Sequence, residues 1–347
     1  HYVRPLDFDL KERLHPKRNP FFEHAEGVAF TAHRGGRCVG RITAQIDREH
    51  LARWKDDTGF FGFLDTIDDA EVARELLGRA EAWLRGRGMK RIRGPMSLST
   101  NEEIGCLVEG FDEAPYLMMP HHRPYQGGLV EQAGYAKEKD LFAWKYHTGE
   151  LNARTRRAHA DVMAMPEVTT RRVSMKDLER DLSIIVDMFN DAWSTNWGFV
   201  PLTRSEIRKM AQDFRILIEP ELTRIVYIEG EPAAFALAVP NLNESIGDLG
   251  GKLLPFGAAK VLYRLKVRGP RTARLFFLGI RKRYQKTKRY AGISPFLYAE
   301  MNDGARRLGI KEGELSWTLE DNNAINAGIR TMGAKVYKRY RVFSKEL

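Results

Sequence analysis

The chain has 347 residues, of which 43% are hydrophobic and 10% aromatic, so its length suits two globular domains and its composition excludes a disordered protein. No apolar run reaches the roughly 18–20 residues of a membrane-spanning helix. The 56 Lys and Arg exceed the 46 Asp and Glu by ten, which favours an anionic partner such as a phosphorylated cofactor, lipid headgroups or nucleic acid. The two cysteines, Cys38 and Cys106, have no metal-ligand spacing, so we expect no metal and a reducing cytoplasm.

The first 150 residues predict one domain with a mixed, mostly antiparallel sheet flanked by helices. Its first two strands flank Arg34-Gly35-Gly36-Arg37, which predicts a hairpin turn. The expected elements, in chain order, are strands 28–32, 38–44 and 59–64, helix 69–85, strand 91–93, helix 128–132 and strand 140–146. A basic segment with helical spacing follows, and we expect residues 151–167 to form a linker helix.

Residues 168–347 predict a second domain of the same class, so the expected fold is α/β (α+β) with two tandem domains. Its elements, in chain order, are strand 169–173, helices 175–193 and 205–214, strands 224–228, 233–239 and 275–280, helix 294–308, strand 314–319, a helix after Asn322 and strand 336–343. Gly134 precedes the last strand of the first domain as Gly333 precedes that of the second, about 200 residues later. We interpret the two domains as diverged copies of one unit.

Residues 275–294 have the order strand, basic loop and helix start. Ser294 followed by Pro295 predicts the helix start, because a serine hydroxyl caps a helix and proline lacks an N–H that would be unpaired there. A helix start presents free backbone N–H groups that attract an anion. The second copy therefore predicts an anion site, whereas the first copy has Asp68 and Asp69 at the corresponding place and should repel a phosphate.

The motif Arg289-x-x-Gly292-x-Ser294 resembles the loop with which acyltransferases of the GNAT superfamily hold the pyrophosphate of coenzyme A. The resemblance implies that the donor is acyl-CoA. Residues that would hold it are Arg289, Gly292, Ile293 and Ser294 at the pyrophosphate and Leu278, Gly279 and Ile280 along the pantetheine arm. Asn322 resembles the asparagine of the next strand–helix unit in the family. Ile329, in contrast, replaces the tyrosine that protonates the leaving thiolate in many members.

A longer set of motifs resembles the group of tandem GNAT proteins that contains bacterial ceramide synthases. The motifs are Gly94-Pro95, Ser99-Thr100-Asn101-Glu102-Glu103, Met118-Met119-Pro120 and Tyr337-Lys338-Arg339-Tyr340-Arg341. The resemblance implies acylation of a sphingoid base, 3-oxosphinganine or sphinganine, by a long-chain acyl-CoA, to give a (keto)ceramide in bacterial sphingolipid synthesis. Two other classes stay open. One is an aminoacyl-tRNA-dependent transferase, which also has tandem GNAT-like domains, and the other is a non-catalytic membrane-surface protein.

Few side chains are candidates for the chemistry of amine acylation. Glu102, or the pair His121 and His122 in a proline-bounded loop, can deprotonate an amine, and Tyr337 or Tyr340 of the last strand can replace the missing acid. Residues expected to line the acceptor or acyl pocket are Asn101, Tyr125, Asn196, Trp197 and Phe199. Each has a structural alternative, namely a solvated helix start, loop packing or strand packing. The histidines have no third ligand nearby in the sequence, so we expect no metal there.

Residues 245–274 fall outside a minimal GNAT domain, and we call them the insert. The insert carries seven Lys or Arg against the single acid Asp248, and its apolar residues have helical spacing. We consider two roles, a helix that covers a sheet edge and a helix that binds an anionic membrane through residues 250–274. The apolar segment Leu253-Leu254-Pro255-Phe256 favours the membrane, so we expect a cytoplasmic protein attached peripherally to the inner membrane.

Overall fold

The computed structural model describes all residues from 1 to 347. The elements of the first half are helix α1 (Asp7–Arg13), the 3₁₀ turn η1 (Pro20–Glu23), strands β1 (Ala25–Arg34) and β2 (Arg37–Asp47), helix α2 (Arg48–Trp54), strand β3 (Thr58–Thr66), helix α3 (Ala70–Arg85), strands β4 (Arg91–Gly94), β5 (Met96–Ser97), β6 (Glu103–Ile104) and β7 (Cys106–Glu109), helix α4 (Gln126–Gln132) and strand β8 (Ala136–His147). Helix α5 (Ala153–Met163) follows and leads into the second half.

The second half contains the remaining elements. They are strand β9 (Val168–Arg171), helices α6 (Leu178–Trp193) and α7 (Arg204–Phe214), the turn η2 (Pro220–Leu222), strands β10 (Thr223–Ile228) and β11 (Glu231–Pro240), helices α8 (Leu242–Ile246) and α9 (Gly257–Leu262), the π-helical turn η3 (Tyr263–Val267), strand β12 (Thr272–Ile280), helix α10 (Lys282–Gln285), the turn η4 (Lys288–Tyr290), helix α11 (Ile293–Arg307), strand β13 (Glu312–Leu319), helix α12 (Asn323–Thr331) and strand β14 (Lys335–Glu346). The predicted strands and helices are all present, with bounds that differ by a few residues.

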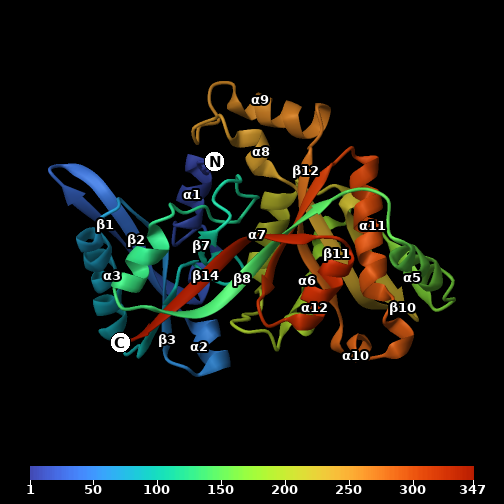
Figure 1. The fold of residues 1–347 in the computed structure, drawn as a ribbon, viewed down its shortest axis with the longest axis horizontal. Coiled ribbons are helices and arrows are strands. Elements are labelled where there is room, and N and C mark those ends of the chain that lie inside the picture. The colour runs from blue at the N-terminus through green and yellow to red at the C-terminus, as the bar shows by residue number, and fades with distance from the viewer.

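The two halves share one continuous sheet. In it the last strand of each half, β8 or β14, pairs with strands of the other half. The order is β1-β2-β3-β4-β14-β8-β13-β12-β11-β10-β9, with β7 beside β14. Strand β14 pairs with β4 of the first half, and β8 pairs with β13 of the second. Figure 1 shows β8, in green, and β14, in red, crossing the middle of the molecule together, where they pair antiparallel. The division of the chain near residue 150 stays a proposal, because each half-sheet contains a strand from the other side of that boundary.

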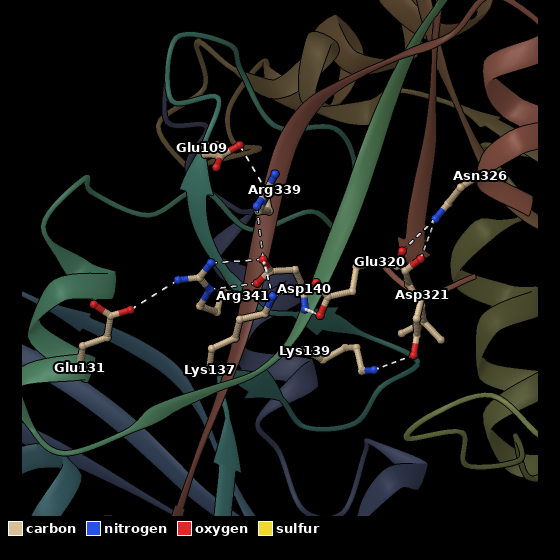
Figure 2. A network of polar contacts seen from close by, with 11 residues as sticks. Glu109, Glu131, Lys137, Lys139, Asp140, Glu320, Asp321, Asn326, Arg339 and Arg341 are labelled. Atoms are coloured by element: carbon tan, nitrogen blue, oxygen red, sulfur yellow. Dashed lines mark hydrogen bonds and ion pairs between the residues drawn. The ribbon is translucent and has the colours of Figure 1, made fainter. Parts of the chain in front are cut away.

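A buried ionic network joins the two exchanged strands (Figure 2). Asp140 of β8 is fully buried and accepts hydrogen bonds from Nε and Nη2 of Arg341 in β14, at 2.9 and 3.2 Å. Lys137 and Arg339 approach the same carboxylate at 3.1 and 3.5 Å. Burial alone would raise the pKa of Asp140, but the hydrogen bonds from Arg341 and Lys137 outweigh it and lower the pKa below its ordinary value. The network therefore holds an anion among cations that come from both strands.

The structure repeats one unit in both halves, as the sequence predicts. The pairs β3–β4 and β12–β13 are parallel, and each pair is connected by a long helix, α3 or α11. Gly134 and Gly333, after the next helix of each unit, have φ angles of +90° and +92°, which a side chain would disfavour. The helix starts differ as expected. The carboxylate of Asp69 accepts hydrogen bonds from two backbone N–H groups of α3, so no free N–H cluster faces a ligand there.

Alternating apolar residues let helices cover both faces of the second half-sheet. Val226 of β10 packs in a core with Phe296 and Leu297 of α11, whereas its neighbour Ile225 packs in a core with Ile185 of α6. Helix α5 lies along α11 in Figure 1, and its Val162 belongs to the α11 core. Helices therefore cover both faces of this half-sheet. The candidate site described below lies where β12 and β13 separate.

The insert forms a projection at the top of the molecule in Figure 1, and its helical part consists of α9 and η3. Val261 and Leu265 pack inward against Leu6 and Val239, so one face of the predicted helix covers the edge of the core. The cationic face is largely paired, since Lys260 and Arg264 both bind Asp248. The residues exposed at the tip are apolar, with Leu254 at 84% and Phe256 at 80% of full exposure. The insert therefore combines the covering role with an exposed apolar tip.

Candidate active site

The site forms where two parallel strands of the second half separate. Strands β12 and β13 pair over four residues, the last pair being Leu275 with Leu315. Beyond that point β12 stays paired with β11, through a bulge that leaves Phe276 without an opposite residue. One edge of β12 therefore faces a gap and not a neighbouring strand.

The backbone of β12 offers hydrogen-bonding groups to this gap. The N–H of Arg281 is bonded to β11, and the alternation of an antiparallel pair then directs the backbone groups of Leu278 and Ile280 away from β11. The carbonyl of Leu278 accepts a hydrogen bond from the indole of Trp193 at 3.3 Å. Gly279, between them, lies so close to the ring of Phe235 that an added Cβ would approach it to 2.7 Å. The three residues predicted to align the pantetheine arm thus lie along the open edge.

A pocket that opens to solvent lies against this gap. Five of the predicted site residues line it together, namely Asn101, Glu102, Asn196, Trp197 and Phe199. Further aromatic side chains in its wall are Phe189 and Trp193 of α6, Phe276 and Phe277 of β12, and Trp317 of β13. A cavity with aromatic walls and a few polar groups suits a hydrocarbon chain with a polar end.

Hydrogen bonds between the two halves hold the mouth of this pocket. The hydroxyl of Thr100 donates to the carbonyl of Gly198 at 3.0 Å, and the amide of Asn101 donates to the carbonyl of Val200 at 3.1 Å. Both acceptors belong to the loop between α6 and α7, which the sequence predicts as a break in the helical pattern. The first half therefore supplies one wall of a site whose strands belong to the second half.

Glu102 is the single acidic residue in the pocket wall. Arg13 of α1 donates from Nε to Glu102 at 2.8 Å and from Nη1 to Glu103 at 2.7 Å, which orients both carboxylates. Burial raises the pKa of Glu102 above its ordinary value and outweighs the opposite effect of Arg13. A carboxylate with a raised pKa is a stronger proton acceptor than an exposed glutamate, so Glu102 has the chemistry of a general base.

The start of α11 carries three consecutive backbone N–H groups with no acceptor in the protein, those of Gly292, Ile293 and Ser294. Hydrogen bonding in the helix begins with the N–H of Phe296, which donates to the carbonyl of Gly292 at 2.9 Å. The predicted serine cap is wrong in detail, because Gly292 is the N-cap residue and the Ser294 side chain makes no capping bond. A helix start with free N–H groups binds anions.

The loop before α11 is strongly basic and only partly neutralised. Between residues 281 and 289 it carries six Lys or Arg and no acid. Arg281 pairs with Asp187, and Arg289 pairs with Glu167 at 2.6 Å, so Arg289 already has a carboxylate partner. The four positive charges without a carboxylate partner are Lys282, Arg283, Lys286 and Lys288. The loop can therefore supply charge to an anion at the helix start, and the role of Arg289 itself stays a prediction.

Asn322 and Ile329 have structural roles in α12. The side chain of Asn322 caps this helix by accepting a hydrogen bond from the N–H of Ile325 at 3.3 Å. Ile329 is 2% exposed and packs with Trp144 and Leu315. A core residue therefore occupies the place where many GNAT enzymes have a tyrosine, and the structure offers no acid there.

Four other predicted residues lie away from the pocket wall. His122 accepts a hydrogen bond from the N–H of Leu107, and burial lowers the pKa of both His121 and His122 to about 4, so both are neutral at pH 7. The hydroxyl of Tyr125 donates to the carbonyl of Thr66 at 2.8 Å. Tyr337 donates its hydroxyl to Glu314. Their roles in catalysis and substrate binding stay predictions.

The pocket wall also contains nine residues that the sequence does not predict as site residues, among them Arg274 and Ser316. The sequence places Arg274 among the cations of the insert, yet its side chain is buried and donates to Ser316 at 2.8 Å. Ser316 in turn donates to the buried carboxylate of Glu314 at 2.6 Å. No local pattern distinguishes Arg274 from the other cations of the insert, because its burial depends on contacts with Ser316 and Leu117, which lie far away in the chain.

The open strand edge, the free helix start and the pocket between two repeated units define a tandem GNAT protein. A solved tandem GNAT protein from the clavulanic acid biosynthesis pathway has the same fold, with a TM-score of 0.53 and 11% identity over 93% of this chain and 83% of that one. No protein-family model matches the chain.

Two relatives are similar over the whole length of the chain. Bacterial ceramide synthase of Caulobacter vibrioides is 41% identical over 350 residues, which cover all of this chain and 90% of the relative. Protein YghO of Escherichia coli K12 is 40% identical over 346 residues, which cover all of this chain and 88% of that protein. The chain therefore belongs to the tandem GNAT acyltransferase family that includes this ceramide synthase.

The structure also bears on membranes and metals. Its helices are all too short or too polar to cross a bilayer. No three His, Cys, Asp or Glu side chains are grouped so that they could hold a metal ion.

Proposed function

We propose that this protein transfers the acyl group of a long-chain acyl-CoA to the amine of a lipid. The acceptor is a sphingoid base, 3-oxosphinganine or sphinganine, and the product is a (keto)ceramide. The observation that carries this proposal is the free helix start of α11 at one end of the open edge of β12, with an aromatic pocket at the other end. The 41% identity to a bacterial ceramide synthase supports the choice of acceptor.

The donor is assigned to the second half. Its pyrophosphate would accept hydrogen bonds from the N–H groups of Gly292, Ile293 and Ser294, and the basic loop would add charge. From the end of β12 at Ile280 to the bulge at Phe276 is about 13 Å of strand, along which the pantetheine arm would bond to the backbone of Leu278 and Ile280. This route brings the thioester to the pocket.

The reaction assigned to the pocket is direct transfer. The nitrogen of the amine attacks the thioester carbon, Glu102 takes one of its protons, and the carbon–sulfur bond breaks to give the amide and coenzyme A. The proton on Glu102 is then available to the leaving thiolate, so the reaction balances without the tyrosine that Ile329 replaces. We assign stabilisation of the oxyanion to backbone N–H groups near the Phe276 bulge, where β12 is no longer paired with β13.

The aromatic wall supports a preference for long hydrocarbon chains. Each CH₂ group moved from water into such a wall contributes about 0.8 kcal/mol, so binding strengthens steadily with chain length until the pocket is filled. The pocket also opens to solvent, so a chain longer than the pocket can extend out of it.

The exposed tip of the insert is assigned to the membrane in which a lipid acceptor would lie. Leu254 and Phe256 would enter the interface between headgroups and acyl chains, and the net charge of +10 would attract an anionic surface. We propose a cytoplasmic protein bound peripherally to the inner membrane through residues 250–274. Because the main cations of this helix are paired with Asp248, apolar contact would contribute more than charge.

The function is tested by changing Gly292 to Asp, which gives the second copy the acidic helix start of the first. A Cβ at Gly292 lies 3.0 Å from Val162, so Gly292→Ala measures crowding alone, and Gly328→Asp adds a carboxylate at an uncrowded helix position. We expect a thermal shift with long-chain acyl-CoA in the wild type and in both controls, but not in Gly292→Asp. Mass spectrometry should detect the amide formed from acyl-CoA and 3-oxosphinganine with the wild type and both controls, but not with Gly292→Asp.

The same thermal-shift screen separates the other two classes. Stabilisation by charged tRNA and not by acyl-CoA would identify an aminoacyl-tRNA-dependent transferase. Stabilisation by neither, together with retained vesicle binding, would identify a non-catalytic membrane-surface protein. Unchanged acyl-CoA binding by Gly292→Asp would reject the assignment of the helix start.

A further inference from the structure

We infer that Arg274 selects the acceptor by binding an uncharged oxygen, a hydroxyl or a ketone, next to the reacting amine. The inference rests on the proposed function, because it requires an amine in the pocket. Arg274 is the only cation in the pocket wall and is 5% exposed. It lies on β12 just before β12 and β13 separate, so its guanidinium is at the narrow end of the gap.

The guanidinium of Arg274 has hydrogen-bonding capacity to spare. Nε donates to Oγ of Ser316 at 2.8 Å, Nη2 donates to the carbonyl of Ser316 at 3.3 Å, and Nη1 donates to the carbonyl of Leu117 at 2.6 Å. A guanidinium has five N–H groups, so one on each Nη has no protein acceptor. Burial removes these two N–H groups from bulk water. An oxygen of the substrate would give them the acceptor that the protein does not provide.

The positive charge of Arg274 is already balanced. The carboxylate of Glu314 lies 3.9 Å from Nε, is fully buried, and accepts hydrogen bonds from Ser316 at 2.6 Å and from Tyr337. A ligand carboxylate or phosphate on Arg274 would place a second anion beside Glu314, where burial removes the screening by water. An uncharged oxygen adds no such repulsion. The arrangement therefore favours a hydroxyl or a ketone and disfavours amino acids as acceptors.

The two charged residues of the wall define a pattern in the substrate. Glu102 comes from the first half and Arg274 from the second, and most of the remaining wall is aromatic. An amine directed at Glu102 and an oxygen on a neighbouring carbon directed at Arg274 use both groups, while the hydrocarbon chain lies against the rings. The substrate class is thus long-chain amines with a vicinal hydroxyl or ketone. In this scheme Ser316, Glu314 and Tyr337 are positioning residues for Arg274.

The test compares three amines of equal chain length, a 2-amino-3-ketone, the 2-aminoalkane without oxygen, and the 2-amino acid. The variants are Arg274→Lys and Ser316→Ala, and Arg271→Lys is the control because Arg271 is exposed near the same strand. We expect the wild type and the control to prefer the aminoketone over the plain amine by about 10- to 100-fold in kcat/KM. Both Arg274→Lys and Ser316→Ala should reduce this ratio to about threefold or less by lowering kcat/KM for the aminoketone, with little change for the plain amine.

The outcomes separate this inference from the proposed function. Equal losses for the aminoketone and the plain amine, or a wild type that accepts the amino acid as well as the aminoketone, would overturn the inference while acyl-CoA binding and amine acylation remain. A wild type that acylates none of the amines would overturn the proposed function first. A parallel series compares 3-hydroxyacyl-CoA with acyl-CoA as donors, to show whether Arg274 binds an oxygen of the acceptor or of the donor. If Arg274→Lys lowers kcat/KM only for the donor that carries the hydroxyl, the assignment of Arg274 to the acceptor is rejected.

Discussion

Replacing Asp140 by asparagine tests the network that joins the exchanged strands. Asparagine keeps the shape but removes the buried charge that faces Arg341, Lys137 and Arg339. Loss of one partner of a buried ion pair costs about 3–5 kcal/mol, and we expect the lower limit because the side chains of Lys137 and Arg339 are partly exposed. With an unfolding entropy of about 2.1 cal/mol/K per residue, or about 0.7 kcal/mol/K for this chain, a loss of about 3 kcal/mol lowers Tm by about 4 °C.

Calorimetry and urea unfolding measure this difference, with Asp321→Asn as the control. Asp321 pairs with Lys139 at 2.8 Å but is 59% exposed, so its loss should change stability by about 0.5 kcal/mol or less. The pKa of Asp140 is lowered in the folded state, so its contribution is complete above the ordinary carboxyl pKa and is lost as pH falls through the folded value. The wild type and Asp140→Asn should therefore converge below about pH 4. A difference below about 1 kcal/mol at pH 7 would refute the reasoning.

Three further predictions concern the site and the insert. Glu102→Gln should lower kcat/KM by about 100-fold and remove the acidic limb of the wild-type pH profile. In the wild type this limb should lie above the ordinary pKa of a glutamate, because burial raises the pKa of Glu102. An acidic limb that is unchanged in Glu102→Gln would show that another residue is the base. Serine at both Leu254 and Phe256 should weaken binding to anionic vesicles by about tenfold per side chain, as measured by co-sedimentation, and a purely salt-dependent interaction would contradict this. Tyr337→Phe should lower activity less than about tenfold if Tyr337 only positions Glu314, whereas a loss of about 100-fold or more would support the predicted acid.

Local patterns were sufficient to predict most of the longer helices and strands of both halves, but not short elements such as α1, α2 and β7. The periodicity of apolar residues, and the glycine, proline and capping residues that end an element, are properties of neighbouring residues. Residues 69–85 and 233–239 are therefore recognisable from the sequence as a helix and a strand. The pairing of strands depends on residues far apart in the chain. Nothing in the spacing of β8 and β14 distinguishes pairing within a half from pairing across halves, because an alternating strand suits either neighbour. The exchange therefore appears only in three dimensions.

The candidate site was predictable in part for the same reason. The predicted anion site at Gly292 depends on a local strand–loop–helix order, and the pocket residues Asn101 and Trp197 lie in segments that interrupt regular patterns. The position of Arg274 depends on its long-range contacts with Ser316 and Leu117, 42 and 157 residues away. The basic composition of the insert predicts that Arg274 is an exposed cation, whereas the structure shows that it is buried.

The exchange of β8 and β14 has a consequence for synthesis on the ribosome. Strand β4 is complete at Gly94, but its neighbour β14 begins only at Lys335. At about 5–20 residues per second, the intervening stretch of about 240 residues takes roughly 10 to 50 seconds to translate. During that time the edge of β4 has no partner, and β8 lacks both of its final neighbours, β13 and β14. The nascent first half therefore exposes unpaired strand edges until the last strand emerges, which makes it a natural client for chaperones.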